Sequence, residues 1–174
     1  SYLASNPSPV IQEDGSVMMI FKGRAHTENG KYSDMALGIA YAPNIEGPYT
    51  VLNNDQPIFQ VDGQGEAEDP FLWKDSKGYH AIFKDHVAKY TGERGGGVMA
   101  HSTDGIHWTV DKDPKAYSRT VEWEDGKVEM QGQLERPFLL FENGKATHAF
   151  FATMDGPGGF ENATKSWNMV IPLK

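Results

Sequence analysis

The sequence of 174 residues predicts an all-β fold of radially repeated sheets, as in a β-propeller, because three short segments read as near-copies of one another. Each copy places a small polar or acidic residue before a proline and continues with an apolar strand, a polar turn with glycine and a second apolar strand. The copies begin at Pro7-Ser8-Pro9, Glu68-Asp69-Pro70 and Glu135-Arg136-Pro137. The last prolines of the three segments are 61 and 67 residues apart. A strand-turn-strand unit that recurs at such an interval is typical of propeller blades.

Turn residues and short apolar runs favour the same fold class along the whole chain. The 19 glycines and 10 prolines fall between the apolar runs, as turn residues do in all-β proteins. Stretches with helical periodicity are nearly absent. Many runs are continuously apolar, which favours strands that are covered on both faces. The expected strands cover residues 17–22, 37–41, 71–73, 79–84, 97–100, 108–110, 121–123, 127–130, 138–141, 147–152 and 168–171.

The first two units also predict an outer pair of strands after the first hairpin. Residues 38–42 form a run of small and apolar residues that is followed by a tight glycine turn and the aromatic Tyr49. Residues 97–102 are followed in the same way by a glycine turn and Trp108. A single hairpin would carry little weight, but two hairpins in register with the larger repeat indicate four-stranded blades.

The repeat divides the chain into three approximate blade units, residues 6–62, 63–131 and 132–174. Closed propellers have about four to eight blades. Three blades alone would expose apolar blade faces and two strand edges. We therefore expect a partial propeller, which is a fragment, a truncated relative or a half-propeller. Either a homo-oligomer or a segment N-terminal to Ser1 would complete it.

Composition excludes several classes of protein and site. The formal charge of −8 and the lack of a basic stretch argue against a nucleic-acid or anionic-membrane partner. The absence of cysteine excludes disulfides, thiolate metal sites and a cysteine nucleophile. The glycine-rich residues 91–97 precede a strand and lack the Lys-Ser/Thr of a phosphate loop. No motif indicates a cofactor or a metal.

Two of the proline-led motifs resemble those of a known group of enzymes. The Asp69-Pro70 and Glu135-Arg136-Pro137 segments resemble the starts of successive blades in five-bladed β-propeller glycoside hydrolases of families 43, 32, 62, 68, 117 and 130. Residues 38–49 and 102–108 look like outer-blade motifs of the same proteins. The resemblance covers most of the chain. Because each motif is short, the specificity lies in the order and spacing of the motifs.

The resemblance implies an active site in a funnel at the propeller axis. In this group the first strand of each blade delivers one side chain to the funnel. Glu135 then matches the general acid, and Asp69 matches the aspartate that orients the acid and adjusts its pKa. The third carboxylate, the base or nucleophile, would come from a blade N-terminal to Ser1. The implied ligand is a plant or algal oligosaccharide or polysaccharide, and the implied location is extracellular or periplasmic.

The chemistry fits this pair of residues. Glycoside hydrolysis needs one protonated carboxyl group to donate to the leaving oxygen and one ionised carboxylate to activate water or attack carbon. Burial or a neighbouring negative charge keeps a glutamic acid protonated near neutral pH, and Asp69 on the adjacent inner strand would supply that charge. In the alternative interpretation, Asp69 and Glu135 only cap strands or pair with Arg136 or Arg119.

Further polar and aromatic residues are candidates for substrate binding because they flank the expected inner strands. Trp73 offers a face for sugar stacking, although a tryptophan in a strand also suits a blade core. Arg136 could hold a carboxylate of the substrate or of the protein. His101 could bind an axial ion, by analogy with some members of the resembled group, and a histidine with its own partner is the alternative. The full set is Asn6, Lys22, Arg24, Glu68, Trp73, Lys84, His86, His101 and Arg136.

Three functions are therefore open from the sequence. The first is part of a propeller glycoside hydrolase with Glu135 as the acid and Asp69 as its modulator. The second is a carbohydrate-binding fragment without turnover. The third is a structural half-propeller whose surfaces serve assembly.

Overall fold

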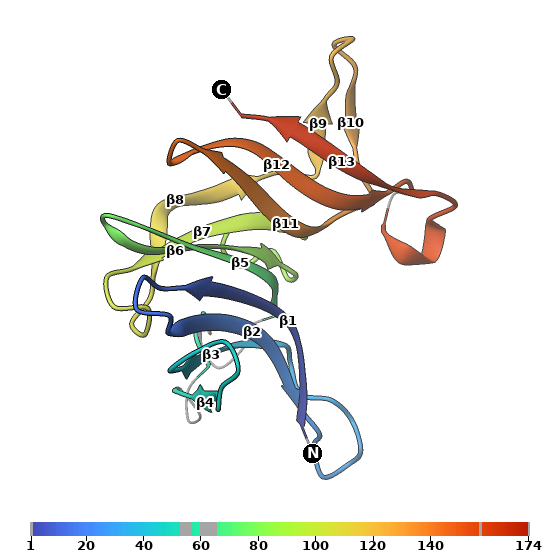
Figure 1. The fold of residues 1–174 in the computed structure, drawn as a ribbon. Helices are drawn as coiled ribbons and strands as arrows, with labels where there is room; N and C mark the ends of the chain where they lie inside the picture. The colour runs from blue at the N-terminus through green and yellow to red at the C-terminus, as the bar shows by residue number, and fades with distance from the viewer. Residues whose placement is uncertain (1, 53–56, 60–65, 157, 174) are drawn as a thin grey trace.

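A computed structural model describes residues 2–52, 57–59, 66–156 and 158–173. The described residues fold into antiparallel sheets that are stacked as a fan, with the first sheet at one end and the third at the other (Figure 1). The only helical element in these residues is one 3₁₀ turn, η1 (Phe160–Asn162). The described part of the protein contains no helix long and apolar enough to cross a membrane.

Two sheets have four strands each, in sequence order, and each strand pairs with the next. The first contains β1 (Tyr2–Ile11), β2 (Val17–Ala25), β3 (Ala36–Ala42) and β4 (Thr50–Val51). The second contains β5 (Ala67–Asp75), β6 (Gly78–Asp85), β7 (Gly96–Ser102) and β8 (Thr109–Tyr117). This order is the four-stranded meander that the sequence predicts for the first two units.

The third sheet has three strands among the described residues, and a separate hairpin precedes it. The sheet contains β11 (Gln133–Glu142), β12 (Lys145–Met154) and β13 (Ser166–Pro172). The hairpin consists of β9 (Thr120–Glu122) and β10 (Val128–Met130), which pair only with each other among the described strands. Figure 1 shows this hairpin projecting beside β13. The predicted strands at 121–123 and 127–130 thus form a hairpin outside the three main sheets.

The first strand of each sheet carries the same irregularity at the residue before a proline. The ladder is interrupted between Ser5 and Ser8, between Glu68 and Phe71, and between Glu135 and Phe138. The three residues in these bulges have positive φ angles: Asn6 (51°), Asp69 (52°) and Arg136 (56°). A bulge also accommodates a proline, which has no N–H to give to the ladder.

The bulges correct the register of the sequence repeat. The structure makes Pro7 the equivalent of Pro70 and Pro137, because each follows the residue with positive φ. The sequence repeat predicted Pro9 as the equivalent, but Pro9 lies in a regular part of the ladder opposite Met19. The Pro7-Ser8-Pro9 segment offers two prolines, and only the backbone geometry shows which one belongs to the bulge.

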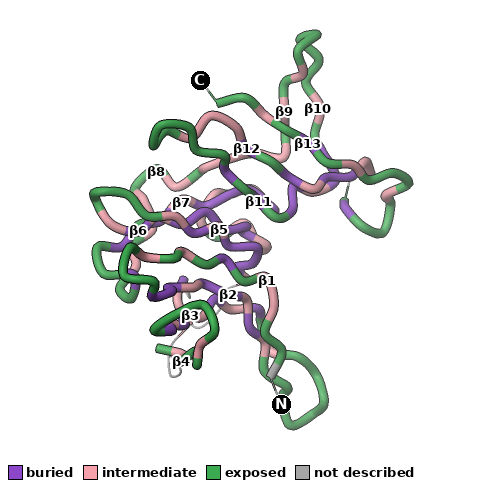
Figure 2. The backbone as a smooth tube through the Cα atoms, viewed as in Figure 1, coloured by how far each residue is buried: buried purple, intermediate pink, exposed green. Residues whose placement is uncertain are grey.

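Two layers of apolar side chains hold the three sheets together, and β6 contributes to both. Ala81 and Phe83 lie in the core cluster shared with the first sheet, whereas Ile82 lies in the cluster shared with the third. This alternation is the two-residue period of a strand. In Figure 2 the buried segments run through the middle of the fan. The second sheet is therefore covered on both faces, as its continuous apolar runs predict.

The outer face of the third sheet is less covered. Phe138, Phe150 and Val170 are opposite one another in register across its three strands, and they are 52%, 38% and 52% exposed. The third sheet thus buries one face against the second sheet and exposes apolar side chains on the other, and Phe138 also contacts Phe71 of the second sheet edge-on at 5.2 Å.

Candidate active site

The three bulges lie side by side and contact one another through side chains. The carboxylate of Asp69 is fully buried and accepts hydrogen bonds from the Asn6 amide and the Arg136 guanidinium. It also accepts the backbone N–H of Arg136 at 3.1 Å. The three equivalent residues of the repeat therefore meet at one point. A positive φ turns each of them out of the regular ladder, which allows the contact.

One residue before each bulge, the second and third sheets carry a glutamate, and one lysine bridges the two. Lys84 is only 1% exposed. Its Nζ lies 2.8 Å from Oε1 of Glu68 and 2.6 Å from Oε1 of Glu135. Glu68 is opposite Lys84 in the ladder of its own sheet, whereas Glu135 belongs to the neighbouring sheet. The bridge joins the inner ends of the two sheets.

Further charged residues surround Glu68. Lys22 Nζ lies 3.1 Å from Oε2 of Glu68, and His86 Nδ1 lies 3.3 Å from Oε1. On the outer side, Glu66 lies 3.3 Å from His86 Nε2 and 3.6 Å from Arg24 Nη2. Lys22 occupies the position in the first sheet that Lys84 occupies in the second, opposite Ser5.

The two glutamates have opposite pKa shifts. Burial by itself raises the pKa of Glu68, but hydrogen bonds from His86 and Lys84 and the charge of Lys84 outweigh it, and the pKa lies well below its usual range. Burial also raises the pKa of Glu135. Lys84 opposes this rise, Asp69 adds to it, and the pKa of Glu135 remains above its usual value. Glu68 therefore stays ionised to lower pH than an ordinary glutamate, whereas Glu135 binds its proton more tightly than an ordinary glutamate does.

Lys84 stays charged between these groups. Burial lowers the pKa of Lys84, but the charges of Glu135 and Glu68 outweigh burial, and the pKa is raised. The ammonium group of Lys84 therefore contacts two carboxyl groups, those of Glu68 and Glu135, whose pKa values are shifted in opposite directions.

A cleft opens beside Glu135. It has a volume of about 460 Å³, within the range of ligand pockets. Its lining comes from the starts and ends of the third sheet's strands and from η1, and includes Glu135, Arg136, Met154, Phe160, Ser166, Trp167 and Asn168. Of the residues around the bulges described above, Glu135 and Arg136 line this cleft. The site can therefore present one titratable carboxyl group and one guanidinium to a ligand.

The structure brings together most of the residues that the sequence analysis singled out. Asn6, Lys22, Glu68, Asp69, Lys84, Glu135 and Arg136 form the inner cluster, with Arg24 and His86 at its edge. The pairing of Asp69 with Arg136, which the alternative interpretation expected, is present. It coexists with the carboxylate cluster rather than replacing it.

Trp73 and His101 do not join this cluster. Trp73 lies near the far end of β5, where its ring stacks on His80 at 5.2 Å and lies 5.9 Å from Phe71. His101 lies toward the far end of β7, with its Nδ1 2.7 Å from Oδ1 of Asp111. Each has its contacts away from the bulges: Trp73 between the second and third sheets, and His101 at an exposed position of β7 between β6 and β8.

Three residues near the site are not among the sequence-predicted candidates. Trp167 and Phe160 line the cleft, but in the sequence they follow the glycine-rich residues 156–159, a composition typical of surface loops. Tyr117, at the end of β8, packs edge-on against Phe151 at 4.8 Å. Burial raises the pKa of Tyr117, and the charges of Asp69 and Glu135 add to the rise. An aromatic residue at a strand end suits a core as well as a site, so the sequence held no signal that separates them.

The carboxylates of Glu68, Asp69 and Glu135 also form the one group of potential metal ligands found in the described residues. One oxygen from each lies within 4.8 Å of the others. Lysine, arginine and asparagine side chains already hold these oxygens. A cation would have to displace them, and we assign no metal to the cluster.

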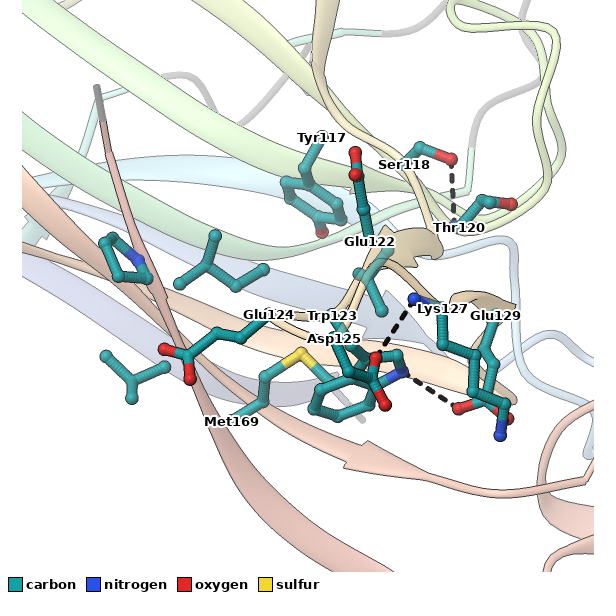
Figure 3. Close-up of a pocket in the computed structure, with 14 residues that line it drawn as sticks. Tyr117, Ser118, Thr120, Glu122, Trp123, Glu124, Asp125, Lys127, Glu129 and Met169 are labelled. Carbon is teal, nitrogen blue, oxygen red and sulfur yellow. Dashed lines mark hydrogen bonds and ion pairs between the residues drawn. The ribbon is translucent and has the colours of Figure 1, made fainter.

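A second groove, of about 790 Å³, lies between the β9–β10 hairpin and β13 (Figure 3). Its lining includes four consecutive residues, 169–172, so it follows an edge of β13 rather than one face. Trp123 lies in it with its indole N–H donated to Glu129 Oε2 at 2.9 Å. The groove occupies the side of β13 where a fourth strand lies in the other two sheets.

Comparisons with known proteins support the fold. No protein-family model and no curated protein match the chain. A solved structure described as a glycoside hydrolase matches with a TM-score of 0.68 and 11% identity, over 98% of this chain and 46% of that one. A structure of BT0996, described as an RGII complex, matches with the same values. The Bombyx mori GH32 β-fructofuranosidase BmSUC1 matches with a TM-score of 0.57 and 14% identity, over 95% of this chain and 33% of that one.

The chain spans less than half the length of these structures. The similarity confirms the predicted fold class: the chain is a partial β-propeller with a glycoside-hydrolase-like fold. At these identities the similarity concerns the fold alone.

Proposed function

We propose that the chain supplies the acid half of a glycoside hydrolase active site, with Glu135 as the general acid and Asp69 as the residue that positions it. One observation carries the proposal. Glu135 is the carboxyl group of the inner cluster that lines the cleft, and its pKa is raised by burial and by Asp69. A general acid needs both access to the ligand and a proton at the working pH.

The surrounding charges suit both protonation states of Glu135. Before the reaction, the protonated carboxyl group would donate to the leaving glycosidic oxygen as the C–O bond breaks. The carboxylate that forms would lie beside the ammonium group of Lys84, at 2.6 Å. Glu68 remains ionised throughout and holds Lys84 in place when Glu135 is neutral.

Asp69 would act on Glu135 through its fixed place beside it. It is tied to the bulges on both sides, by Asn6 and by Arg136, so its negative charge is fixed close to Glu135. A fixed negative charge disfavours ionisation of a neighbouring carboxyl group. The base or nucleophile is not assigned, because the equivalent position in the first sheet is Ser5.

Hydrolysis of aryl glycosides with good and poor leaving groups tests this proposal, with azide or formate added as an external nucleophile in place of the unassigned base. Glu135→Gln should lower the rate of hydrolysis of glycosides with poor leaving groups by about 100-fold or more. The rate for activated aryl glycosides should fall much less, because their leaving groups need little protonation. Circular dichroism should show an intact fold. If Glu135→Gln left the rate of hydrolysis of glycosides with poor leaving groups unchanged, the assignment of Glu135 as the acid would be overturned.

A second candidate is a carbohydrate-binding propeller fragment without turnover. The observation that favours it is Ser5, which places no carboxylate at the first sheet's inner end. Sugar binding without hydrolysis of activated substrates, with or without azide, would favour this candidate over the enzyme.

A further inference from the structure

We propose that the cleft beside Glu135 binds an acidic sugar, with Arg136 holding the carboxylate of a uronic acid ring and Trp167 packing on the ring itself. The inference rests on the proposed function in one respect, which is that the ligand of this cleft is a sugar. It adds the chemical class of that sugar and the two residues that select it.

Arg136 lines the cleft from the bulge in β11. Arg136 has a φ of 56°, which is uncommon for a long side chain and places it outside the ladder of β11. Its backbone N–H and one guanidinium nitrogen bind Asp69, which is completely buried. The guanidinium is thus anchored from behind by a group that no ligand can reach.

The rest of the guanidinium faces outward. The Arg136 side chain is 56% exposed, in contrast to the buried carboxylate that anchors it. A guanidinium carries five N–H donors in a planar fork, and Asp69 takes one of its terminal nitrogens. The remaining donors can meet a ligand carboxylate in the two-bond geometry that makes such pairs specific.

The charge of the cleft favours an anion. Glu135 and Arg136 are the two charged residues in its lining among the described residues. The carboxyl group of Glu135 is 11% exposed and already contacts Lys84 at 2.6 Å. The Arg136 side chain is 56% exposed, so its guanidinium is the more accessible charged group at the cleft wall.

The rest of the lining is aromatic and polar. It includes Trp167 of β13, which is half-buried, and Phe160 of η1, which is 69% exposed. Ser166 and Asn168 of β13 add polar groups to the same lining. Aromatic and polar groups in one cleft suit a ring that has an apolar face and hydroxyl groups at its edge. With the guanidinium of Arg136, this lining matches a sugar ring that carries a carboxylate.

Calorimetric titration of the protein with the methyl glycosides of galacturonic and glucuronic acid, and with their uncharged methyl esters, tests the proposal. The esters keep the ring and remove the charge. We expect the acids to bind about tenfold more tightly than their esters, as a charge-assisted pair requires. Equal affinity for acid and ester would overturn the uronic acid assignment while leaving a neutral sugar site in the cleft.

Variants locate the interaction. Arg136→Gln should remove the preference for the acid and leave ester binding within about twofold, whereas Arg94→Gln, which removes a charge from an exposed loop, should keep the preference. Trp167→Ala should weaken acid and ester alike. Binding of the acid that survives both Arg136→Gln and Trp167→Ala would place the ligand elsewhere and overturn the proposal.

The outcomes also separate this inference from the proposed function. A loss of hydrolysis in Glu135→Gln with equal affinity for acid and ester would support the acid role and reject the uronic acid. Preference for the acid with hydrolysis that does not depend on Glu135 would do the reverse. Absence of binding by any of these sugars to the folded protein would overturn the inference outright.

Discussion

The inner ends of the second and third sheets carry a glutamate at the same strand position, and the two glutamates behave in opposite ways. Glu68 has a depressed pKa and Glu135 a raised one. Lys84 contacts both glutamates, but Glu68 also receives hydrogen bonds from His86 and Lys22. Asp69 instead raises the pKa of Glu135, and the residue opposite Glu135 on the next strand is Ala152 rather than a lysine. Equivalent backbone positions thus hold carboxyl groups that are suited to different tasks.

The repeat itself creates this asymmetry. The lysine on the second strand of one sheet reaches the glutamate of the next sheet, as Lys22 does to Glu68 and Lys84 does to Glu135. Glu68 therefore receives one lysine from its own sheet and one from the preceding sheet. Glu135 receives only the preceding one, because Ala152 stands where its own lysine would be. The missing lysine at position 152 is therefore one cause of the opposite pKa shifts, together with His86 beside Glu68 and Asp69 beside Glu135.

Lys84→Met should have the largest effect, because it leaves two buried carboxylates without their shared cation. We expect the free energy of unfolding to fall by about 3–5 kcal/mol at pH 7, measured by urea denaturation. Lys115→Met is the matched control, since Lys115 pairs with Glu93 at 3.2 Å but is 43% exposed, and it should cost less than about 1 kcal/mol. Equal costs in the two variants would show that the bridge is not the centre of the cluster.

The pH dependence of stability should distinguish the two glutamates. Because the pKa of Glu68 is lowered on folding, its contribution is present above the unfolded value of about 4.3 and is lost as the pH falls below it. Glu68→Gln should therefore cost about 2 kcal/mol at pH 7 and progressively less in acid.

Glu135→Gln should show the opposite trend. Its raised pKa makes ionised Glu135 unfavourable to folding, so the wild type loses stability, relative to the glutamine variant, as the pH rises through that pKa. Below the unfolded value the two proteins should be equally stable. Urea denaturation between pH 3 and pH 8 measures both variants, and parallel pH profiles would contradict the assigned pKa shifts.

Ala152→Lys should make the third sheet resemble the second. A lysine opposite Glu135 should bring the pKa of Glu135 below the ordinary value of about 4.3, which a carboxyl ¹³C NMR titration measures. Ala146→Lys, farther along β12, serves as the control and should leave it raised. If Ala152→Lys left the pKa of Glu135 above 4.3, the absent lysine could not explain the difference between the sheets.

The second sheet is covered on both faces, whereas the third sheet exposes apolar side chains on one face. We predict that this exposed face makes the protein self-associate. We expect concentration-dependent association in analytical ultracentrifugation, since the outer face of the third sheet exposes Phe138, Phe150 and Val170. Phe150→Lys should weaken association and change the free energy of unfolding by less than about 0.5 kcal/mol. A monomer at all concentrations would exclude closure by a second copy.

The fold was largely predictable because each copy of the sequence repeat is determined by residues that are close together in the sequence. Each strand-turn-strand copy depends on nearby residues, and three copies in order suffice to indicate stacked sheets. The candidate pair Asp69 and Glu135 followed from the same motifs by resemblance, and the structure places both in one cluster. The register of the first copy did not follow, since Pro7 and Pro9 are equally acceptable locally and only the bulge distinguishes them.

The sequence by itself determined the sheets, their order and the inner strands, because alternation, turns and repeats act over short distances along the polypeptide. Only the tertiary structure decided which charges meet. Lys84 lies 51 positions from Glu135 and Arg136 lies 67 from Asp69, and no short-range pattern encodes those contacts. Trp167 entered the site for the same reason, because the packing of η1 and β13 around Glu135 forms the cleft. Electrostatic and binding properties depend on distances across sheets, and those distances exist only once the sheets are stacked.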